Sequence, residues 1–352
     1  MNPMMRHPVR AGFLALLLAA AGAGAGRAQA PTLKLSADTT LSARGLDVLV
    51  FNNWYSGLFS DSKLSGVELI QHGVRIATNG DVRLSNTPGQ WDPIPTFSGR
   101  RLDGDGGIEA SLAYPDYAFH YRVQVRPSGE GFLVRVVLDQ PLPERLEGRA
   151  GFNLEFLPSA YFGKAYLMDG RPGQLPRAAG DSMYRDPDGA LQAAPFATGG
   201  TLVLAPGDPE RRVTIQGHGA TLSLYDGRDL AQNGWYVVRT PIPAHRTGTV
   251  VEWLVTPSRI PGWTRAPVIA HSQVGYHPDQ EKVAILELDP NYAGPLDVTL
   301  TRITPDGRSL PVLHGEAQPW GRYLRYHYAR FDFSAAKEPG LYVLEFGGVR
   351  TE

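Results

Sequence analysis

The most constraining feature of this sequence is an alternation of apolar and polar side chains, broken at short intervals by glycine and proline. From Phe119 to Arg126 the odd-numbered positions are apolar and the even-numbered positions are polar, which is typical of a strand with one buried and one solvated face. The 40 glycines and 29 prolines interrupt the longer stretches in which a helix could form. We therefore predict an all-β chain of short antiparallel strands.

Similar short runs recur along the first two thirds of the chain. They predict strands at 46–51, 67–71, 74–77, 82–84, 108–113, 132–138, 152–156, 201–204, 213–215, 221–224, 235–239 and 250–255. Asn79-Gly80 is typical of a tight turn between paired strands, so 74–77 and 82–84 are expected to form a hairpin. The Gly- and Pro-rich segment 163–195 lacks alternation and is expected to be a long surface loop.

A segment spaced by prolines divides the chain after the last of these strands. Pro257, Pro261 and Pro267 lie in an irregular stretch, and such stretches act as stiff spacers between domains. We expect a large antiparallel β-sandwich domain over 31–264 and a small immunoglobulin-like (Ig-like) β-sandwich over 268–352. In the small domain, strands are predicted near Val274 and at 282–288, 296–303, 323–331 and 340–346.

The first thirty residues have the order of features of a signal peptide. Basic residues are followed by an apolar run from Phe13 to Ala20 and by Ala28-Gln29-Ala30, an A-x-A cleavage site. The apolar run is far shorter than the roughly 20 residues needed to span a bilayer. We expect residues 1–30 to be removed near Ala30, and the mature protein to be secreted or periplasmic with no membrane partner.

Composition excludes several classes of function. Removing residues 1–30 lowers the count of basic residues from 34 to 31 and leaves 35 acidic residues, a net charge of −4. This balance disfavours nucleic acid and anionic membranes, which attract concentrated basic surfaces. The chain has no cysteine, so thiol catalysis, disulfides and cysteine-ligated metal sites are excluded.

No motif predicts a metal, a cofactor or a serine nucleophile. The sequence has neither an H-E-x-x-H metal motif nor a G-x-S-x-G elbow, and the spacing of His218, His245, His271 and His277 predicts no ligand set. Asp103–Gly107 resembles part of a calcium loop without its later ligands, so a solvated hairpin turn is the favoured interpretation. We expect no metal and no cofactor.

Two blocks near the C-terminus carry a family resemblance. His271-Ser272-Gln273-Val274-Gly275-Tyr276-His277-Pro278, followed by Lys282-Val283-Ala284, resembles the NQVGY-x-P…K-x-A opening of the N-terminal Ig-like domain of family 9 glycoside hydrolases. Phe331-Asp332-Phe333-Ser334 and Pro339-Gly340-Leu341-Tyr342 are similar to its closing DFS…PGxY segment. Ser272 stands where the family has Asn, a mild departure.

The resemblance implies a partner domain and a substrate class. In that family the Ig-like domain packs on an (α/α)6 barrel, where an aspartate pair and a glutamic acid hydrolyse β-glycosidic bonds with inversion. No DAGD motif occurs here, and the resemblance covers only about a quarter of the chain. It implies the non-catalytic N-terminal part of a secreted family 9 protein. Its partners would be the missing catalytic barrel and a β-glucan-like polysaccharide, and no catalytic residue is expected in these 352 residues.

Aromatic residues supply the candidate carbohydrate contacts. Flat rings suit the apolar faces of sugars, while polar neighbours can bind hydroxyl groups. Core packing is the competing interpretation. The candidates are Trp54, Trp91, Trp235 and Tyr236, of which Trp54 and Trp91 have the most polar and irregular neighbours.

Other hypotheses stay open at this level. One is a stand-alone secreted carbohydrate-binding protein, and another is a structural or partner-binding β protein. An acid pair drawn from Asp226, Asp229 and Glu252 is a further hypothesis, against the default of isolated surface carboxylates. We also expect the Ig-like domain to expose an apolar patch larger than the few hundred Å² usual for monomers.

Overall fold

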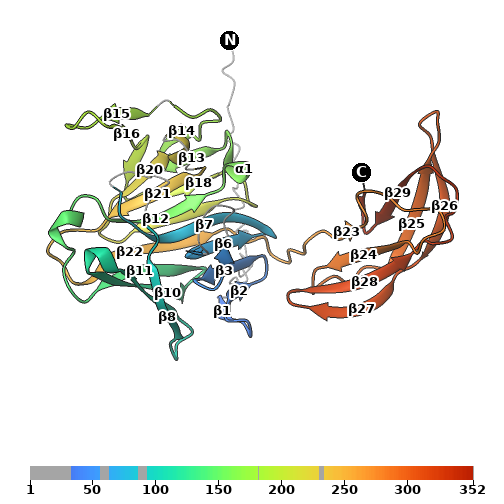
Figure 1. Cartoon of the computed structure of the whole chain (residues 1–352), viewed down its shortest axis with the longest axis horizontal. Helices are drawn as coiled ribbons and strands as arrows, with labels where there is room; N and C mark the ends of the chain where they lie inside the picture. The colour runs from blue at the N-terminus through green and yellow to red at the C-terminus, as the bar shows by residue number, and fades with distance from the viewer. Residues whose placement is uncertain (1–32, 56–62, 86–92, 181, 230–233, 352) are drawn as a thin grey trace, which may run out of the picture. The chain divides into compact units, whose positions relative to one another are not determined.

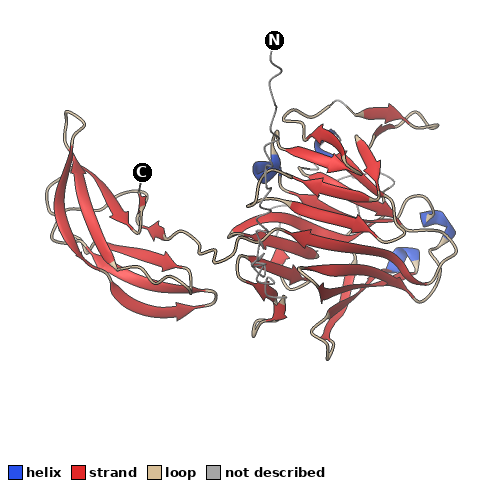
Figure 2. Cartoon of the chain, turned by 180° about the vertical axis from the view of Figure 1, so that it is seen from behind, coloured by secondary structure: helices blue, strands red, loops and turns tan. Residues whose placement is uncertain are grey.

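The computed structural model describes residues 33–55, 63–85, 93–180, 182–229 and 234–351. Within these ranges the regular structure is almost entirely β-strand (Figure 2), which confirms the all-β prediction. The exceptions are α1 (Pro158–Tyr161) and three 3-10 turns at Pro115–Tyr117, Glu144–Leu146 and Gly227–Asp229. None of the described helices is long and apolar enough to cross a membrane. The expected signal peptide and Trp91 lie outside the described residues.

The large domain contains two nine-stranded antiparallel sheets that bury one common hydrophobic core (Figure 1). The first sheet has the order β1 (Lys34–Leu35), β2 (Leu41–Ala43), β3 (Leu46–Val50), β6 (Val67–Gln71), β7 (Val74–Arg83), β12 (Gly151–Phe156), β21 (Tyr236–Pro241), β20 (Leu222–Asp226) and β17 (Ala197–Gly199). The second has the order β14 (Arg171–Gln174), β13 (Ala165–Met168), β18 (Thr201–Leu204), β19 (Val213–Gly217), β22 (Gly248–Pro257), β11 (Gly131–Leu138), β10 (Phe119–Ser128), β9 (Ile108–Tyr114) and β8 (Thr96–Leu102).

The alternation seen in the sequence sets the core of this domain. In β10 the apolar residues Val123 and Val125 are fully buried, while Gln124 between them is partly exposed. Trp253 on β22 is the largest fully buried side chain, and its ring meets that of Phe152 edge-on at 4.9 Å. Its indole N–H donates to the hydroxyl of Thr240 at 3.0 Å, so the core satisfies the polar group that it buries.

The hairpin predicted at Asn79-Gly80 is wrong. Strand β7 runs without a break from Val74 to Arg83, and Asn79 lies inside it with φ of 53°. The pairing register shifts there, as in a β-bulge. A Cβ built on Gly80 would lie 2.6 Å from the Cβ of Val67. Glycine is therefore needed for close approach of two strands, which local sequence cannot distinguish from a turn.

The segment 163–195 is more regular than expected. It contains β13 and β14, which join the second sheet, and a separate hairpin of β15 (Met183–Arg185) and β16 (Leu191–Ala193). The prediction of a long loop without regular structure is wrong, because these strands are too short to show an alternation. A second small hairpin pairs β4 (Trp54–Tyr55) with β5 (Lys63–Leu64).

The C-terminal part folds into two four-stranded antiparallel sheets around a second core. One sheet has the order β23 (Val268–Ala270), β24 (Val283–Leu288), β28 (Tyr326–Asp332) and β27 (Gln318–Tyr323). The other has the order β26 (Ser309–Glu316), β25 (Asp297–Ile303), β29 (Leu341–Phe346) and β30 (Val349–Arg350). The strand expected near Val274 is absent from this described region: that residue is 98% exposed in a turn. Strands β26 and β27 were not predicted, because most of their side chains are exposed.

Candidate functional site

Among the aromatic candidates in the described residues, Trp54 has an exposed ring. Trp54 on β4 has 59% of its surface exposed, and its ring meets Phe97 edge-on at 6.4 Å. The neighbouring Asn53 donates to the buried carboxylate of Glu68 at 2.8 Å. Trp54 therefore has the exposed ring and polar surroundings that sugar binding requires, and its role stays a prediction.

The other two described candidates lie in packed surroundings. Trp235 packs against the small cluster formed by Ala193, Tyr225 and Val237. Tyr236 is fully buried, and its hydroxyl donates to the carbonyl of Pro176. As sugar contacts both stay predictions, but these surroundings agree with the competing interpretation of core packing.

The carboxylates proposed as an acid pair divide into two groups. Asp226 and Asp229 line one pocket at the end of β20. Glu252 lies on the second sheet, where it accepts from Arg135 and lies 2.7 Å from Nδ1 of His218. The hydrogen bond with His218, helped by Arg135, lowers the pKa of Glu252 below its usual value. Glu252 is therefore part of a surface ion-pair cluster and does not join the two aspartates.

The structure also places the four histidines considered as metal ligands. Within the described ranges there is no group of three or more His, Cys, Asp or Glu side chains arranged to hold a metal ion. The calcium-like segment around Asp103 is the turn between β8 and β9. There the Asp103 carboxylate accepts from the backbone N–H of Gly107 at 2.6 Å and pairs with Arg126 at 2.7 Å.

A row of buried polar residues on the first sheet was not foreseen. Glu68, Glu155 and Arg239 are each less than 5% exposed. Glu68 accepts from Thr78 at 2.9 Å, and Glu155 accepts from Asn79 at 2.6 Å. Buried charges are costly unless paired, and these hydrogen bonds show that the row is satisfied. Alternation predicts which side chains share one face of a strand, but it does not show whether other segments cover that face.

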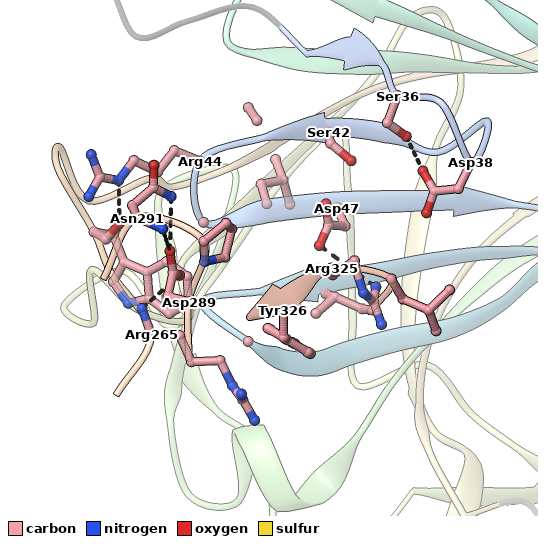
Figure 3. Close-up of a pocket in the computed structure, with 18 of the residues that line it drawn as sticks. Ser36, Asp38, Ser42, Arg44, Asp47, Arg265, Asp289, Asn291, Arg325 and Tyr326 are labelled. Carbon is pink, nitrogen blue, oxygen red and sulfur yellow. Dashed lines mark hydrogen bonds and ion pairs between the residues drawn. The ribbon is translucent and has the colours of Figure 1, made fainter. Parts of the chain in front are cut away.

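A pocket of about 380 Å³ is lined by residues from distant parts of the sequence (Figure 3). Asp47 on β3 and Arg325, just before β28, point toward each other across it, 3.8 Å apart. Burial raises the pKa of Asp47, and a hydrogen bond from Ser42 partly offsets this effect. No sequence pattern predicts this pocket, because its residues come together only in the fold.

Much of the charge in this pocket is already paired. Arg44 donates to the hydroxyl of Thr264 at 2.7 Å. The backbone N–H of Arg265 donates to Asp289 at 3.0 Å, and its guanidinium lies 4.6 Å from the ring centre of Tyr326. These contacts resemble a packed junction more than a catalytic site, because the arginines and acids satisfy one another.

The two C-terminal motif blocks meet in space. The backbone N–H of Lys282 donates to the hydroxyl of Ser334 at 2.8 Å, and the N–H of Phe333 donates to the carbonyl of Lys282 at 2.9 Å. The ring of Tyr276 meets Phe333 edge-on at 5.2 Å, and its hydroxyl accepts from Ser272 and donates to Val283. The motif residues therefore have a structural role: they join the start of the domain to the segment that follows β28.

Comparison with known families identifies this domain. Residues 264–351 match the family described as the cellulase N-terminal ig-like domain. The C-terminal part of the chain is thus a cellulase-associated Ig-like domain, which confirms the coarser part of the resemblance. No curated protein and no solved structure was found to match the chain.

Proposed function

We propose that this chain is the non-catalytic N-terminal part of a secreted or periplasmic family 9 glycoside hydrolase. In the intact protein a catalytic barrel would hydrolyse β-glycosidic bonds of a β-glucan-like polysaccharide by inversion. The observation that supports this is the cellulase-type Ig-like domain at 264–351, with both motif blocks in place. The Ig-like domain would support the barrel, and the large β-sandwich would extend the substrate-binding surface.

The surface of the Ig-like domain supports a docking role. Of the 15 large apolar side chains exposed in the described residues, eight belong to this domain. Trp320, Tyr323 and Leu324, on β27 and the turn after it, are 59–71% exposed. We define these three residues as the β27 patch. Exposed clusters of large apolar side chains are unusual on monomers and typical of interfaces.

The test compares residues 31–352 with the intact parent protein. We expect the parent to release reducing ends from a soluble β-glucan and residues 31–352 alone to release none. Replacing Trp320 and Leu324 by alanine in the parent should lower both its activity and its melting temperature. A transcript that encodes no helical catalytic domain after codon 352, or hydrolysis by residues 31–352 alone, would contradict the proposal.

A stand-alone carbohydrate-binding protein is the second candidate, favoured by the exposed ring of Trp54. It predicts that residues 31–352 are retarded in a gel that contains soluble β-glucan. Trp54→Ala should reduce the affinity at least tenfold, whereas Trp320→Ala, which removes an equally exposed indole on the Ig-like domain, should leave it unchanged. Equal retardation of both variants would exclude Trp54 as the contact, and neither binding nor a downstream barrel would favour a structural protein.

A further inference from the structure

The proline-spaced segment that follows β22 is attached to the large domain at several points. We call residues 258–264 the linker. It has no regular secondary structure, yet Ser258, Ile260, Trp263 and Thr264 each contact side chains of the first sheet or its turns. Proline-rich spacers hold domains apart without such contacts. The linker is therefore a fixed element of the fold, and what fixes it can be examined contact by contact.

Gln71, the last residue of β6, holds the first half of the linker. Its fully buried side-chain amide donates to the carbonyls of Ser258 and Arg212 at 2.8 and 3.2 Å. The hydroxyl of Ser258 donates in turn to the carbonyl of Pro209 at 2.7 Å. Amide, hydroxyl and carbonyl groups do not change charge between pH 5 and 8. This attachment is therefore insensitive to pH in that range.

His72, the next residue, holds the second half of the linker and is only 6% exposed. Its Nδ1 lies 3.0 Å from the carbonyl oxygen of Glu210, which can only accept, so Nδ1 carries a hydrogen. Its Nε2 accepts from the backbone N–H of Ile260 at 3.2 Å, so Nε2 carries none. The two partners therefore specify a neutral imidazole with its hydrogen on Nδ1.

The imidazole is enclosed by the linker and by the turn between β2 and β3. The indole of Trp263 lies 5.4 Å from its ring centre. In the turn, Arg44 donates to the carbonyl of Trp263 and to the hydroxyl of Thr264, and a Cβ built on Gly45 would lie 3.0 Å from the imidazole. The second half of the linker is thus packed directly on the ring.

A proton added to Nε2 would remove the acceptor that Ile260 uses. Two N–H groups would then face each other, and the backbone N–H of Ile260 would lose its hydrogen bond. The indole of Trp263 attracts a cation, but it does not replace that bond. Histidine is the side chain whose charge ordinarily changes between pH 5 and 8. The linker contact at Ile260 therefore depends on a group that titrates in this range.

The charges on the surrounding elements do not favour a cation at this position. The charged residues of the turn at 44–45, the loop at 205–212 and the linker are Arg44, Asp208, Glu210, Arg211, Arg212 and Arg259. Both acids of this set have basic partners: Asp208 pairs with Lys164 at 2.7 Å, and Glu210 with Arg211 at 3.8 Å. A positive charge on His72 would be added to a mainly basic neighbourhood.

We propose that His72 is a pH-sensitive switch in the linker: protonation of its Nε2 releases residues 260–264 from the large domain, while Gln71 keeps Ser258 attached. Release lengthens the free chain ahead of the Ig-like domain, whose family match begins at residue 264. The inference rests on contacts within the chain and does not depend on the proposed catalytic partner.

Hydrogen exchange of residues 31–352 at pH 7.5 and 5.0, with exchange times scaled for the intrinsic rate, tests the switch. The linker peptide contains the N–H of Ile260 and that of Trp263, which donates to the carbonyl of Ile260 at 3.1 Å. We expect its protection to fall at least tenfold at the lower pH. Strand β22, immediately before the linker, should keep its protection at both values and serves as the internal reference.

Two histidine variants assign the effect. His72→Gln has an amide oxygen that can still accept from Ile260 but cannot titrate, so linker protection should be equal at the two pH values. His120→Gln, the same change at an exposed position of the large domain, should keep the pH dependence of the wild type. Nitrogen-15 spectra of the imidazole, assigned by the signals lost in His72→Gln, should show hydrogen on Nδ1 at pH 7.5.

Three results would overturn the proposal. The first is equal protection of the wild-type linker at the two pH values. The second is a pH dependence that persists in a folded His72→Gln variant, which would place the titrating group elsewhere. The third is hydrogen on Nε2 at pH 7.5, since that tautomer cannot accept from Ile260.

Discussion

The large β-sandwich and the Ig-like domain differ in how far they bury their large aromatic side chains. In the large domain Trp253 is fully buried and charged residues such as Glu68 and Arg239 are enclosed and hydrogen-bonded. In the Ig-like domain Trp320 is 61% exposed and strand β27 has no buried residue. The large domain thus encloses and pairs these side chains, while the smaller one presents apolar side chains outward. This contrast is what the docking role proposed above for the Ig-like domain would require.

The largest expected effect is in the large-domain core. Trp253→Ala should reduce the free energy of unfolding of that domain by about 3–5 kcal/mol, because it removes a fully buried ring and leaves a cavity. Thermal unfolding of residues 31–352, followed by hydrogen exchange resolved by peptide, should show early exposure of β11 and β22. Unchanged protection of these strands would mean that the core relaxes around the loss.

An intermediate effect is expected where the two motif blocks meet. Lys282 is only 5% exposed, and its ammonium donates to the carbonyls of Pro278 and Gln280 at 2.6 and 3.1 Å. Lys282→Met keeps the length of the side chain but leaves these acceptors without their donor, at a cost of about 1–3 kcal/mol. Exchange protection should fall in the Ig-like domain alone. A loss of protection in the large domain would break the comparison between them.

A smaller effect should depend on pH. The pKa of Glu252 is lowered in the folded state, first by the hydrogen bond with His218. Its contribution to stability is therefore present above the unfolded pKa, about 4.5, and is lost as the pH falls through the lower folded value. Glu252→Gln should cost about 0.5–1 kcal/mol at pH 7, as expected for a partly exposed pair. Denaturant unfolding at pH 7 and pH 3 should show this cost only at the higher pH.

The smallest effect on stability should come from the exposed tryptophan of the β27 patch. Trp320→Ala in residues 31–352 should change the free energy of unfolding by less than about 0.5 kcal/mol, as at most surface sites. Chemical denaturation in parallel with Trp253→Ala makes this a matched pair of indole deletions. A cost comparable to that of Trp253→Ala would show that Trp320 supports its own domain and is not kept for a partner.

Much of the fold could be predicted from sequence, since side-chain alternation follows directly from strand geometry. The strands at 67–71 and 201–204 were predicted with the observed bounds. Failures came where the pattern is short or locally ambiguous. Asn79-Gly80 has the composition of a turn, yet the constraint on Gly80 comes from Val67 on the neighbouring strand. Edge strand β27 shows no alternation because neither of its faces is buried.

The candidate sites were less predictable than the fold. Sequence composition predicts Trp54 and Tyr236 alike as candidate sugar contacts, and it cannot tell that the first ring is exposed and the second is enclosed. It also grouped Glu252 with Asp226 and Asp229, although Glu252 belongs to the other sheet. Burial and proximity depend on the packing of segments that are far apart in the chain.

The sequence by itself determined the class of the protein: an all-β chain without cysteine chemistry that carries a cellulase-type Ig-like domain. These properties reside in residue periodicity, composition and two local motifs. Only the tertiary structure decided which polar groups meet. Arg228 joins the 176–177 segment to Asp226, and Pro176, Asp226 and Asp229 line one pocket there. Alternation specifies which side of a strand faces inward, whereas a binding pocket depends on what the rest of the chain places over it.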